Sequence, residues 1–265
     1  MRFNITLQAL DRNIVLPINY QYPLSSWIYH TLEQGDRELA DFLHEEGYGD
    51  SGHQRFKFYS FSELRTPGAR VRGNRLLLSQ PKIRFSISFL TDRAAQTLIM
   101  GLFRRSEPSW LGDHISGGYF KVSAVEMQML PVLHDQVDFR TVSPAVVSIA
   151  DPNTDGSLGK RFLSPQDEGY DKQLIGNLRR KFTAARKAGL IEMTNSDPVI
   201  DYQLLSRTVK EKRIDLMRGQ PGYTRVRGYK FQFSLRAPEE VLRLALLAGV
   251  GEKNAMGFGG VEGIL

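Results

Sequence analysis

Short stretches of alternating hydrophobic and polar residues punctuate the first half of the chain. Residues 3–9 and 83–89 alternate strictly, which is typical of half-buried strands. Residues 24–46 instead have helical spacing, broken at Gly35, where Asp36 suits the N-cap of a second segment. The predicted order is strand 3–9, interrupted helix 24–46, strand 56–61, hairpin tip 65–74, strand 83–89, a helix from Thr91 to Phe103, and strand 119–129.

The second half repeats this order of elements without repeating the residues. Its predicted elements are strand 139–149, polar loop 151–165, helix 166–187, strands 203–217 and 223–235, a helix opened by Pro238, and strand 260–265. Each half therefore fits β-α-β-β-α-β. The pattern predicts an α+β fold of two tandem ferredoxin-like (RRM-like) βαββαβ domains, at residues 1–133 and 134–265. A single larger α+β domain is the alternative.

The composition excludes several kinds of catalytic and metal-binding site. The 265 residues include no cysteine, which excludes disulfides, thiolate metal sites and a cysteine nucleophile. No histidine pair has the i, i+3 or i, i+4 spacing of a metal site, so we expect neither a metal nor another cofactor. The first residues lack the regions of a signal peptide, and no apolar run reaches 18 residues, so we expect a soluble intracellular protein without a membrane partner.

Positive charge is concentrated in the second half. The net charge is +6, of which residues 1–133 contribute +2 (15 basic, 13 acidic) and residues 134–265 contribute +4 (20 basic, 16 acidic). Basic residues interleaved with Tyr223 and Tyr229 suit RNA phosphates and stacked bases, although a solvated strand surface is the plain alternative. The cations of this segment are Arg207, Lys210, Lys212, Arg213, Arg218, Arg225, Arg227 and Lys230. A basic helix adds Lys172, Arg179, Arg180, Lys181, Arg186 and Lys187.

The segment from Gly249 to Gly260 contains five glycines in twelve residues, with Lys253 and Asn254 between them. Glycine permits positive φ angles and close backbone approach. The segment is not a P-loop, because no Gly-Lys-Ser/Thr follows at the required spacing. It is not a dinucleotide fingerprint either, because Asn254 occupies the place of the third glycine. A generic glycine-rich turn is the alternative.

Several motifs together point to a family. The string GVGEKNAMGFG before a short terminal strand resembles the C-terminal glycine-rich loop of CRISPR repeat-RNA processing endoribonucleases, within the repeat-associated mysterious protein superfamily. The MRFNITL start and the segments LSSWIY (24–29), ADFLHE (40–45) and FYS (58–60) also resemble this family, in the same order along the chain. The resemblance implies metal-independent RNA cleavage in which the ribose 2′-OH attacks the adjacent phosphate, leaving a 2′,3′-cyclic phosphate and a 5′-OH.

The same resemblance assigns catalytic residues. Tyr29 and His44 fall on the family's catalytic tyrosine and histidine, and histidine suits proton transfer because its pKa lies near neutrality. The family's catalytic lysine has no clean counterpart: Arg55 occupies the aligned place, Lys57 follows two residues later, and His53 is a further candidate. Without the resemblance, Tyr29 would be interpreted as a tyrosine on the flank of a helix, and His44 as a histidine at a helix C-terminus. Each lies about 140° around its helix from an apolar residue, and so points away from the predicted core.

The combined prediction is a cytoplasmic prokaryotic endoribonuclease that cuts CRISPR precursor RNA within its repeats. Its expected partners are repeat RNA and a CRISPR effector complex, and it is expected to be a monomer or homodimer. The rival prediction is a non-catalytic RNA-binding subunit of such a complex, and a general RNA-binding protein is a third. The residues expected to bind RNA are Lys57, Arg179, Arg180, Arg207, Lys210, Lys212, Arg225, Arg227, Lys230, Gly251, Lys253, Asn254, Gly257 and Gly259.

Overall fold

The first half of the chain forms a five-stranded antiparallel sheet in the order β3-β6-β1-β8-β7. The computed structural model describes residues 1–49, 55–105, 107–152, 158–192, 197–217, 219 and 221–264. The strands of this sheet are β1 (Arg2–Ala9), β3 (Tyr59–Phe61), β6 (Lys82–Phe89), β7 (Ser109–Gly112) and β8 (Gly117–Gln128). Alternation on β1 places Ile5 and Leu7 fully in the core, with Ile5 opposite Phe85 on β6.

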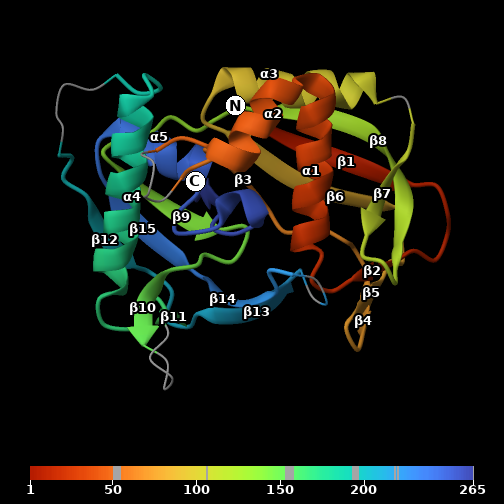
Figure 1. Ribbon diagram of the computed structural model, residues 1–265. Coiled ribbons are helices and arrows are strands. Elements are labelled where there is room, and N and C mark those ends of the chain that lie inside the picture. Colours follow the sequence, from red (N-terminus) through yellow and green to blue (C-terminus); the bar gives the residue numbers. More distant parts are fainter. Residues whose placement is uncertain are drawn as a thin grey trace.

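Helices cover one face of this sheet (Figure 1). They are α1 (Gln21–Gly35), α2 (Arg37–Asp41), a π-helical turn η1 (Phe42–Glu46) and α3 (Asp92–Arg104). Two predicted caps are confirmed: the Asp36 carboxylate accepts the Leu39 amide at 3.1 Å, and the Thr91 hydroxyl accepts the Ala94 amide at 3.4 Å. The Asp36 cap starts α2 in a new direction immediately after α1 ends.

The second half forms a four-stranded antiparallel sheet in the order β12-β15-β9-β16. Its elements are β9 (Gln136–Thr141), α4 (Tyr170–Lys187), β12 (Asp201–Leu204), β15 (Gln232–Arg236), α5 (Glu239–Ala248) and β16 (Val261–Gly263). In each half, the strand–helix–strand–strand–helix–strand units occupy the sheet in the same spatial order, with the fourth strand beside the first. This is the ferredoxin-like arrangement, and the predicted tandem fold is confirmed. The boundary between residues 133 and 134 stays a prediction.

Two hairpins are inserted into the second unit. They are β10 (Ser148–Pro152) with β11 (Leu158–Phe162), and β13 (Lys210–Leu216) with β14 (Thr224–Lys230). The predictions of one strand over 139–149, of strands over 203–217 and 223–235, and of a plain loop over 151–165 were therefore wrong. Pro144 has no amide hydrogen for a ladder, and the Val142 and Ser143 amides bond the Gly260 carbonyl, so β9 ends at Thr141. Helix α4 begins later than predicted because turns precede it, with the Ser164 amide bonded to Asp167.

A smaller three-stranded sheet lies beside the first unit. It contains β2 (Val15–Pro17), β4 (Arg70–Arg72) and β5 (Arg75–Leu77) in the order β2-β5-β4. The prediction of a hairpin tip over 65–74 is borne out in its second half, where β4 and β5 turn at Gly73. None of the helices in the described ranges has both the length and the apolar content needed to cross a membrane.

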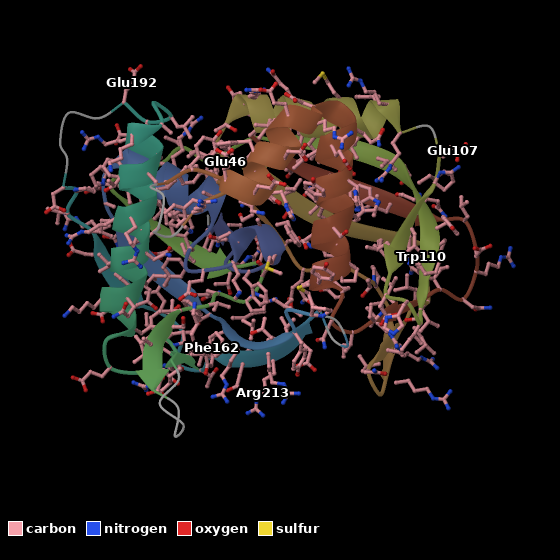
Figure 2. All side chains as sticks on the ribbon, viewed as in Figure 1. Glu46, Glu107, Trp110, Phe162, Glu192 and Arg213 are labelled. Carbon is pink, nitrogen blue, oxygen red and sulfur yellow. The ribbon has the colours of Figure 1, made fainter. Side chains whose placement is uncertain are left out.

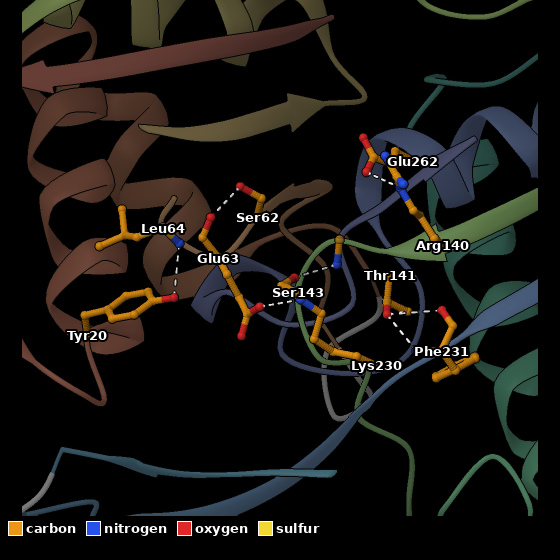
Figure 3. Close-up of polar contacts among 11 residues, drawn as sticks. Tyr20, Ser62, Glu63, Leu64, Arg140, Thr141, Ser143, Lys230, Phe231 and Glu262 are labelled. Carbon is orange, nitrogen blue, oxygen red and sulfur yellow. Dashed lines mark hydrogen bonds and ion pairs between the residues drawn. The ribbon is translucent and has the colours of Figure 1, made fainter. Parts of the chain in front are cut away.

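Polar contacts join the two units (Figure 3). Lys230 on β14 forms a 2.5 Å ion pair with Glu63, which follows β3, and the Glu63 amide donates to the Val142 carbonyl at 2.9 Å. Arg2 on β1 donates to the carbonyls of Leu246 and Val261 in the second unit. These partly buried contacts fix β1 and the segment after β3 against the second unit.

Candidate active site

Tyr29 and His44 lie against each other at the junction of α1, α2 and η1. Their ring centroids are 4.8 Å apart with an interplanar angle of 47°. Tyr29 is half-buried near the end of α1, and His44 is exposed on the π-helical turn. Because Asp36 redirects the chain between the helices, two residues fifteen positions apart come into contact on the surface. Both side chains lie outside the core, as the helical angles predicted.

Asp41 is a third member of this group, and the sequence analysis assigned it no role. The Tyr29 hydroxyl donates to Asp41 Oδ1 at 3.0 Å. Burial raises the pKa of Tyr29, and the bond to Asp41 and the negative charges of Asp41, Glu33 and Glu45 raise it further. Tyr29 is therefore held as a neutral phenol, which can donate a proton or hydrogen bond but is poorly suited to accept one.

Arg55 lies next to this pair. Its Nη1 donates to the Glu45 carbonyl at 2.7 Å, one residue beyond His44. The backbones of Tyr48 and Phe56 exchange two hydrogen bonds of 2.7 Å, which closes the intervening loop and brings Arg55 back to η1. Stacking of Tyr48 on Phe58 and of Phe58 on Phe56 supports the same segment. His53, the other candidate of this region, lies outside the described residues.

A cavity of about 310 Å³ opens between the two units beside Arg55. Residues 55–59 of the first unit form one side, and β11, α4 and the glycine-rich loop form the other. Arg55, Lys57, Lys160, Lys181 and Lys253 all line it, and Glu252 is the one acidic residue among the described residues that do so. Burial lowers the pKa of both Lys57 and Lys253, because a desolvated ammonium is disfavoured. The cavity has the charge of a site for anionic groups.

Lys181 is the least exposed cation of this cavity, at 1 % exposure. The sequence analysis counted it among the cations of the basic helix, but its burial removes it from the exposed surface of that helix. Its Nζ donates to the Gly249 carbonyl at 2.7 Å and to Asn254 Oδ1 at 2.6 Å. Asn254 in turn donates at 3.0 Å to the carbonyls of Val250 and Phe258. The Asn254 amide thus holds the loop together from within.

The glycines of the loop are required by its packing. Gly259 has φ +65°, and a Cβ there would lie 1.9 Å from the Val250 carbonyl oxygen. Gly251 has φ +67°, and a Cβ there would lie 2.3 Å from the Val146 carbonyl oxygen. Gly257 and Gly259 are themselves buried. No other residue type fits such close approach at positive φ.

The other cations expected to bind RNA lie away from this cavity, on the β13–β14 hairpin, on α4 and in the chain before β13. Arg225 pairs with Asp215 at 2.8 Å and Arg227 with Glu211 at 3.7 Å, which neutralises part of the hairpin surface. Within the described part of the chain, Lys210 and Lys212 have no carboxylate partner. The remaining exposed cations are Arg179, Arg180 and Arg207. Figure 2 shows Arg213 of the same hairpin extending away from the protein.

Over the ranges that the structure describes, no group of three or more His, Asp or Glu side chains could hold a metal ion. The side chains at the junction of α1 and η1 supply an imidazole, a phenol, a carboxylate and a guanidinium. These groups supply proton transfer, hydrogen-bond donation and charge stabilisation.

The fold and this site define a protein with two ferredoxin-like units and a glycine-rich loop between them. Residues 15–124 match the family described as CRISPR-associated protein Cas6, N-terminal, and residues 128–263 match CRISPR associated protein Cas6, C-terminal. The chain belongs to the Cas6 family.

Individual relatives extend over nearly the whole chain. The chain is 25% identical over 269 residues to "CRISPR-associated endoribonuclease Cas6 1" of Methanocaldococcus jannaschii, covering 100% of this chain and 93% of that protein. It is 24% identical to "CRISPR-associated endoribonuclease Cas6" of Pyrococcus furiosus, covering 99% and 89%. A solved structure, "Characterization of a Cas6-related gene from Pyrococcus furiosus", has a TM-score of 0.79 at 22% identity, covering 100% of this chain and 98% of that one. This last similarity concerns the fold.

Replacing Asp41 with asparagine tests how Tyr29 is held. The substitution removes one negative charge and weakens the acceptor, so we expect the pKa of Tyr29 to fall toward its ordinary value. NMR of ring-labelled tyrosine, with Tyr29 assigned through Tyr29→Phe, measures the titration. Glu46→Gln, an exposed residue of the same turn, is the matched control and should leave the titration unchanged. An unchanged Tyr29 titration in Asp41→Asn would contradict this account.

Proposed function

We propose that this chain is an endoribonuclease that cuts CRISPR precursor RNA within its repeats without a metal ion. The contact between the Tyr29 and His44 rings, with Arg55 beside them, carries the proposal. RNA brings its own nucleophile in the ribose 2′-OH, so such a site needs only proton transfer and charge stabilisation. The two relatives above that are named endoribonucleases support the same function.

The reaction forms one bond to phosphorus and breaks another. The 2′-oxygen attacks the adjacent phosphorus while His44, in its neutral form, accepts the 2′-OH proton. The bond from phosphorus to the 5′-oxygen breaks, and that oxygen takes the phenol proton of Tyr29. The products are a 2′,3′-cyclic phosphate and a 5′-OH; afterwards His44 releases its proton to solvent and Tyr29 regains one from solvent.

Tyr29 and Arg55 have the complementary roles. Because the pKa of Tyr29 is raised, its phenol stays protonated and donates toward the leaving 5′-oxygen, while Asp41 orients it in the free protein. The Arg55 guanidinium stabilises the negative charge that develops on the phosphoryl oxygens. This scheme needs no lysine to transfer a proton. It is therefore compatible with an arginine in the place of the family's lysine.

The RNA chain would run from this site into the cation-lined cavity between the units. Arg55 lies beside both the catalytic pair and the cavity, since its guanidinium donates a hydrogen bond to the Glu45 carbonyl and also lines the cavity. Lys57, Lys160 and Lys253 would hold backbone phosphates there, and the exposed Lys210 and Lys212 of the hairpin would extend the positive surface. Contacts to phosphates position RNA without reading its sequence.

Cleavage of repeat RNA in the presence of EDTA tests this function. We expect cutting at one place per repeat, with a 2′,3′-cyclic phosphate on the 5′ fragment, and no loss of rate when EDTA is added. Substituting 2′-deoxyribose at the cut site should abolish cutting, because it removes the nucleophile. Cutting that requires a divalent ion, or that proceeds equally on the 2′-deoxy substrate, would refute the mechanism.

The rival function is that of a non-catalytic RNA-binding subunit of an effector complex. The arginine in the place of the family's lysine favours it. The same assay separates the two, because the rival predicts tight binding of repeat RNA that stays intact. A general RNA-binding protein would show equal affinity for repeat RNA and for scrambled RNA of equal length.

A further inference from the structure

A second and larger cavity, of about 830 Å³, lies between α1 and β7. Pockets of roughly 300–1,000 Å³ hold whole small molecules. Tyr22, Trp27 and His30 line it from α1, and the His30 ring also lies 5.5 Å from the ring of Tyr29. The opposite wall comes from β7 and the loop that follows it. Figure 1 shows α1 between α2 and β7, so the groove follows the flank of α1 that faces β7 and adjoins the catalytic pair through His30.

The groove contains both tryptophans of the protein, Trp27 and Trp110. Trp27 is buried, and its Nε1 donates to Ser109 Oγ at 2.6 Å. Trp110 is 47 % exposed on β7, where Figure 2 labels it, and Tyr119 packs against its ring at 5.3 Å. An aromatic ring that is held by its neighbour and open on the groove side offers a flat surface for stacking.

Among the described residues of the groove, ion pairs balance the arginine and aspartate charges except at Arg105. Arg75 pairs with Asp113 at 2.5 Å, and Asp215 pairs with Arg225 at 2.8 Å. Arg105 lies 5.5 Å over the Trp27 ring and donates to Thr31 Oγ1 at 3.0 Å. Among the described residues no carboxylate pairs with Arg105, although it is half-buried and its pKa is lowered by that burial. A desolvated guanidinium without a counter-charge fits an anionic group of a ligand.

We propose that this groove binds one nucleotide of single-stranded RNA, with its base stacked on Trp110 and its phosphate beside Arg105. The proposal rests on the proposed function in that it assumes RNA as the ligand. Because His30 lines the groove and its ring contacts Tyr29, an RNA strand leaving the groove reaches the catalytic pair within a few nucleotides. The groove thus holds a nucleotide near the cut and fixes the register in which the RNA meets His44.

Tryptophan fluorescence reports on this groove directly, because no other tryptophan exists in the chain. The probe is repeat RNA carrying 2′-O-methyl groups throughout, which cannot be cut by its own 2′-oxygen. We expect this RNA to quench the emission, with the same midpoint as binding followed by fluorescence anisotropy. The Trp27→Phe variant should keep the quenching, because Trp110 carries the stacking.

Substitutions in the groove measure how much base stacking and the phosphate contact contribute to the affinity for RNA. Trp110→Ala should weaken binding roughly 5- to 150-fold, the range expected for losing one stacked base, while Trp110→Phe should retain most of the affinity. Arg105→Gln should reduce the slope of log affinity against log salt by roughly 0.7, the value for one phosphate contact on a single strand. Phe103→Ala removes an aromatic residue that is 82 % exposed and does not line the groove, and should bind as the wild type does.

The outcomes separate this proposal from the nuclease function. The groove proposal is overturned if RNA binds without quenching and both Trp110→Ala and Arg105→Gln bind with wild-type affinity. If the same preparation still cleaves unmodified RNA, the proposed function stands. Quenching with loss of affinity in Trp110→Ala, but with unmodified RNA left intact, supports the groove and overturns the nuclease function.

Discussion

Replacing His44 with alanine is expected to reduce the cleavage rate of repeat RNA by about 10²- to 10⁴-fold, the usual contribution of a positioned acid or base. His44 is exposed and its ring packs against the ring of Tyr29, so the substitution leaves the core intact. The affinity for RNA should change little, because no phosphate-binding cation is removed. Single-turnover cleavage at saturating RNA measures the rate, and anisotropy measures the affinity.

His134→Ala is the matched control for this experiment. His134 is also exposed, lies before β9 and takes no part in the site, so its removal should leave the rate unchanged. Cutting by His44→Ala at the wild-type rate would remove His44 from the mechanism. Loss of both binding and cutting in His44→Ala would instead assign the residue to RNA binding, and would contradict the separation of roles proposed above.

Local signals were sufficient to predict the elements that carry the site. Asp36 and Thr91 are caps whose side chains bond backbone amides three residues ahead, so their effect is readable in a short window of sequence. The alternation of residues 3–9 and 83–89 likewise reports directly on a sheet with one buried face. The tandem ferredoxin-like fold follows from such signals, since each unit needs only the order of its strands and helices.

The inserted hairpins could not be predicted in the same way. The β13–β14 hairpin begins and ends within stretches that read as single long strands, because strand-forming residues continue across its boundaries. Its place is set by tertiary packing: Ile214, Leu216 and Val226 form a small core with Phe258 of the glycine-rich loop. Contacts of this range leave no periodic signal in the sequence.

The same limit applies to Asp41 and to the groove beside α1. Asp41 lies near Tyr29 only because α2 turns back after Asp36, and its carboxylate looks like that of any surface residue in the sequence. Trp27 and Trp110 are 83 positions apart, and a shared cavity appears only once β7 packs beside α1. The resemblance to the family therefore pointed to Tyr29 and His44, and the spacing along the helices agreed with their exposure, but neither signal identified the groups that surround them.

The second large effect that we expect is a loss of stability on replacing Lys181. Replacing it with methionine fills the same space but leaves the Gly249 carbonyl and Asn254 Oδ1 without their donor. A buried acceptor left unpaired costs about 1–3 kcal/mol, so two of them should lower the free energy of unfolding by about 3 kcal/mol at alkaline pH. The exchange of the Val250 and Gly259 amides with solvent should also accelerate, because these amides belong to the loop that Lys181 holds.

The pH dependence of stability distinguishes the lysine from a merely well-packed side chain. Burial lowers the pKa of Lys181 from 10.5 to about 7. Between these values the unfolded chain binds a proton that the folded protein has released, so the free energy of unfolding rises with pH across this window. Below pH 7 both states carry the proton, and the folded protein bears the desolvation of a buried ammonium, so this stabilisation is absent.

Urea unfolding of the wild type, Lys181→Met and Lys172→Met between pH 6 and 9 tests this account. The stability difference between the wild type and Lys181→Met should grow as pH rises above 7. Lys172→Met, which changes an exposed lysine of the same helix, should follow the wild type throughout. A difference that is independent of pH would show that Lys181 is charged or neutral in both states alike. Unchanged exchange of the Val250 and Gly259 amides in Lys181→Met would show that the glycine-rich loop keeps its shape without the lysine, and the cavity beside Arg55 would then depend on the glycines and Asn254 alone.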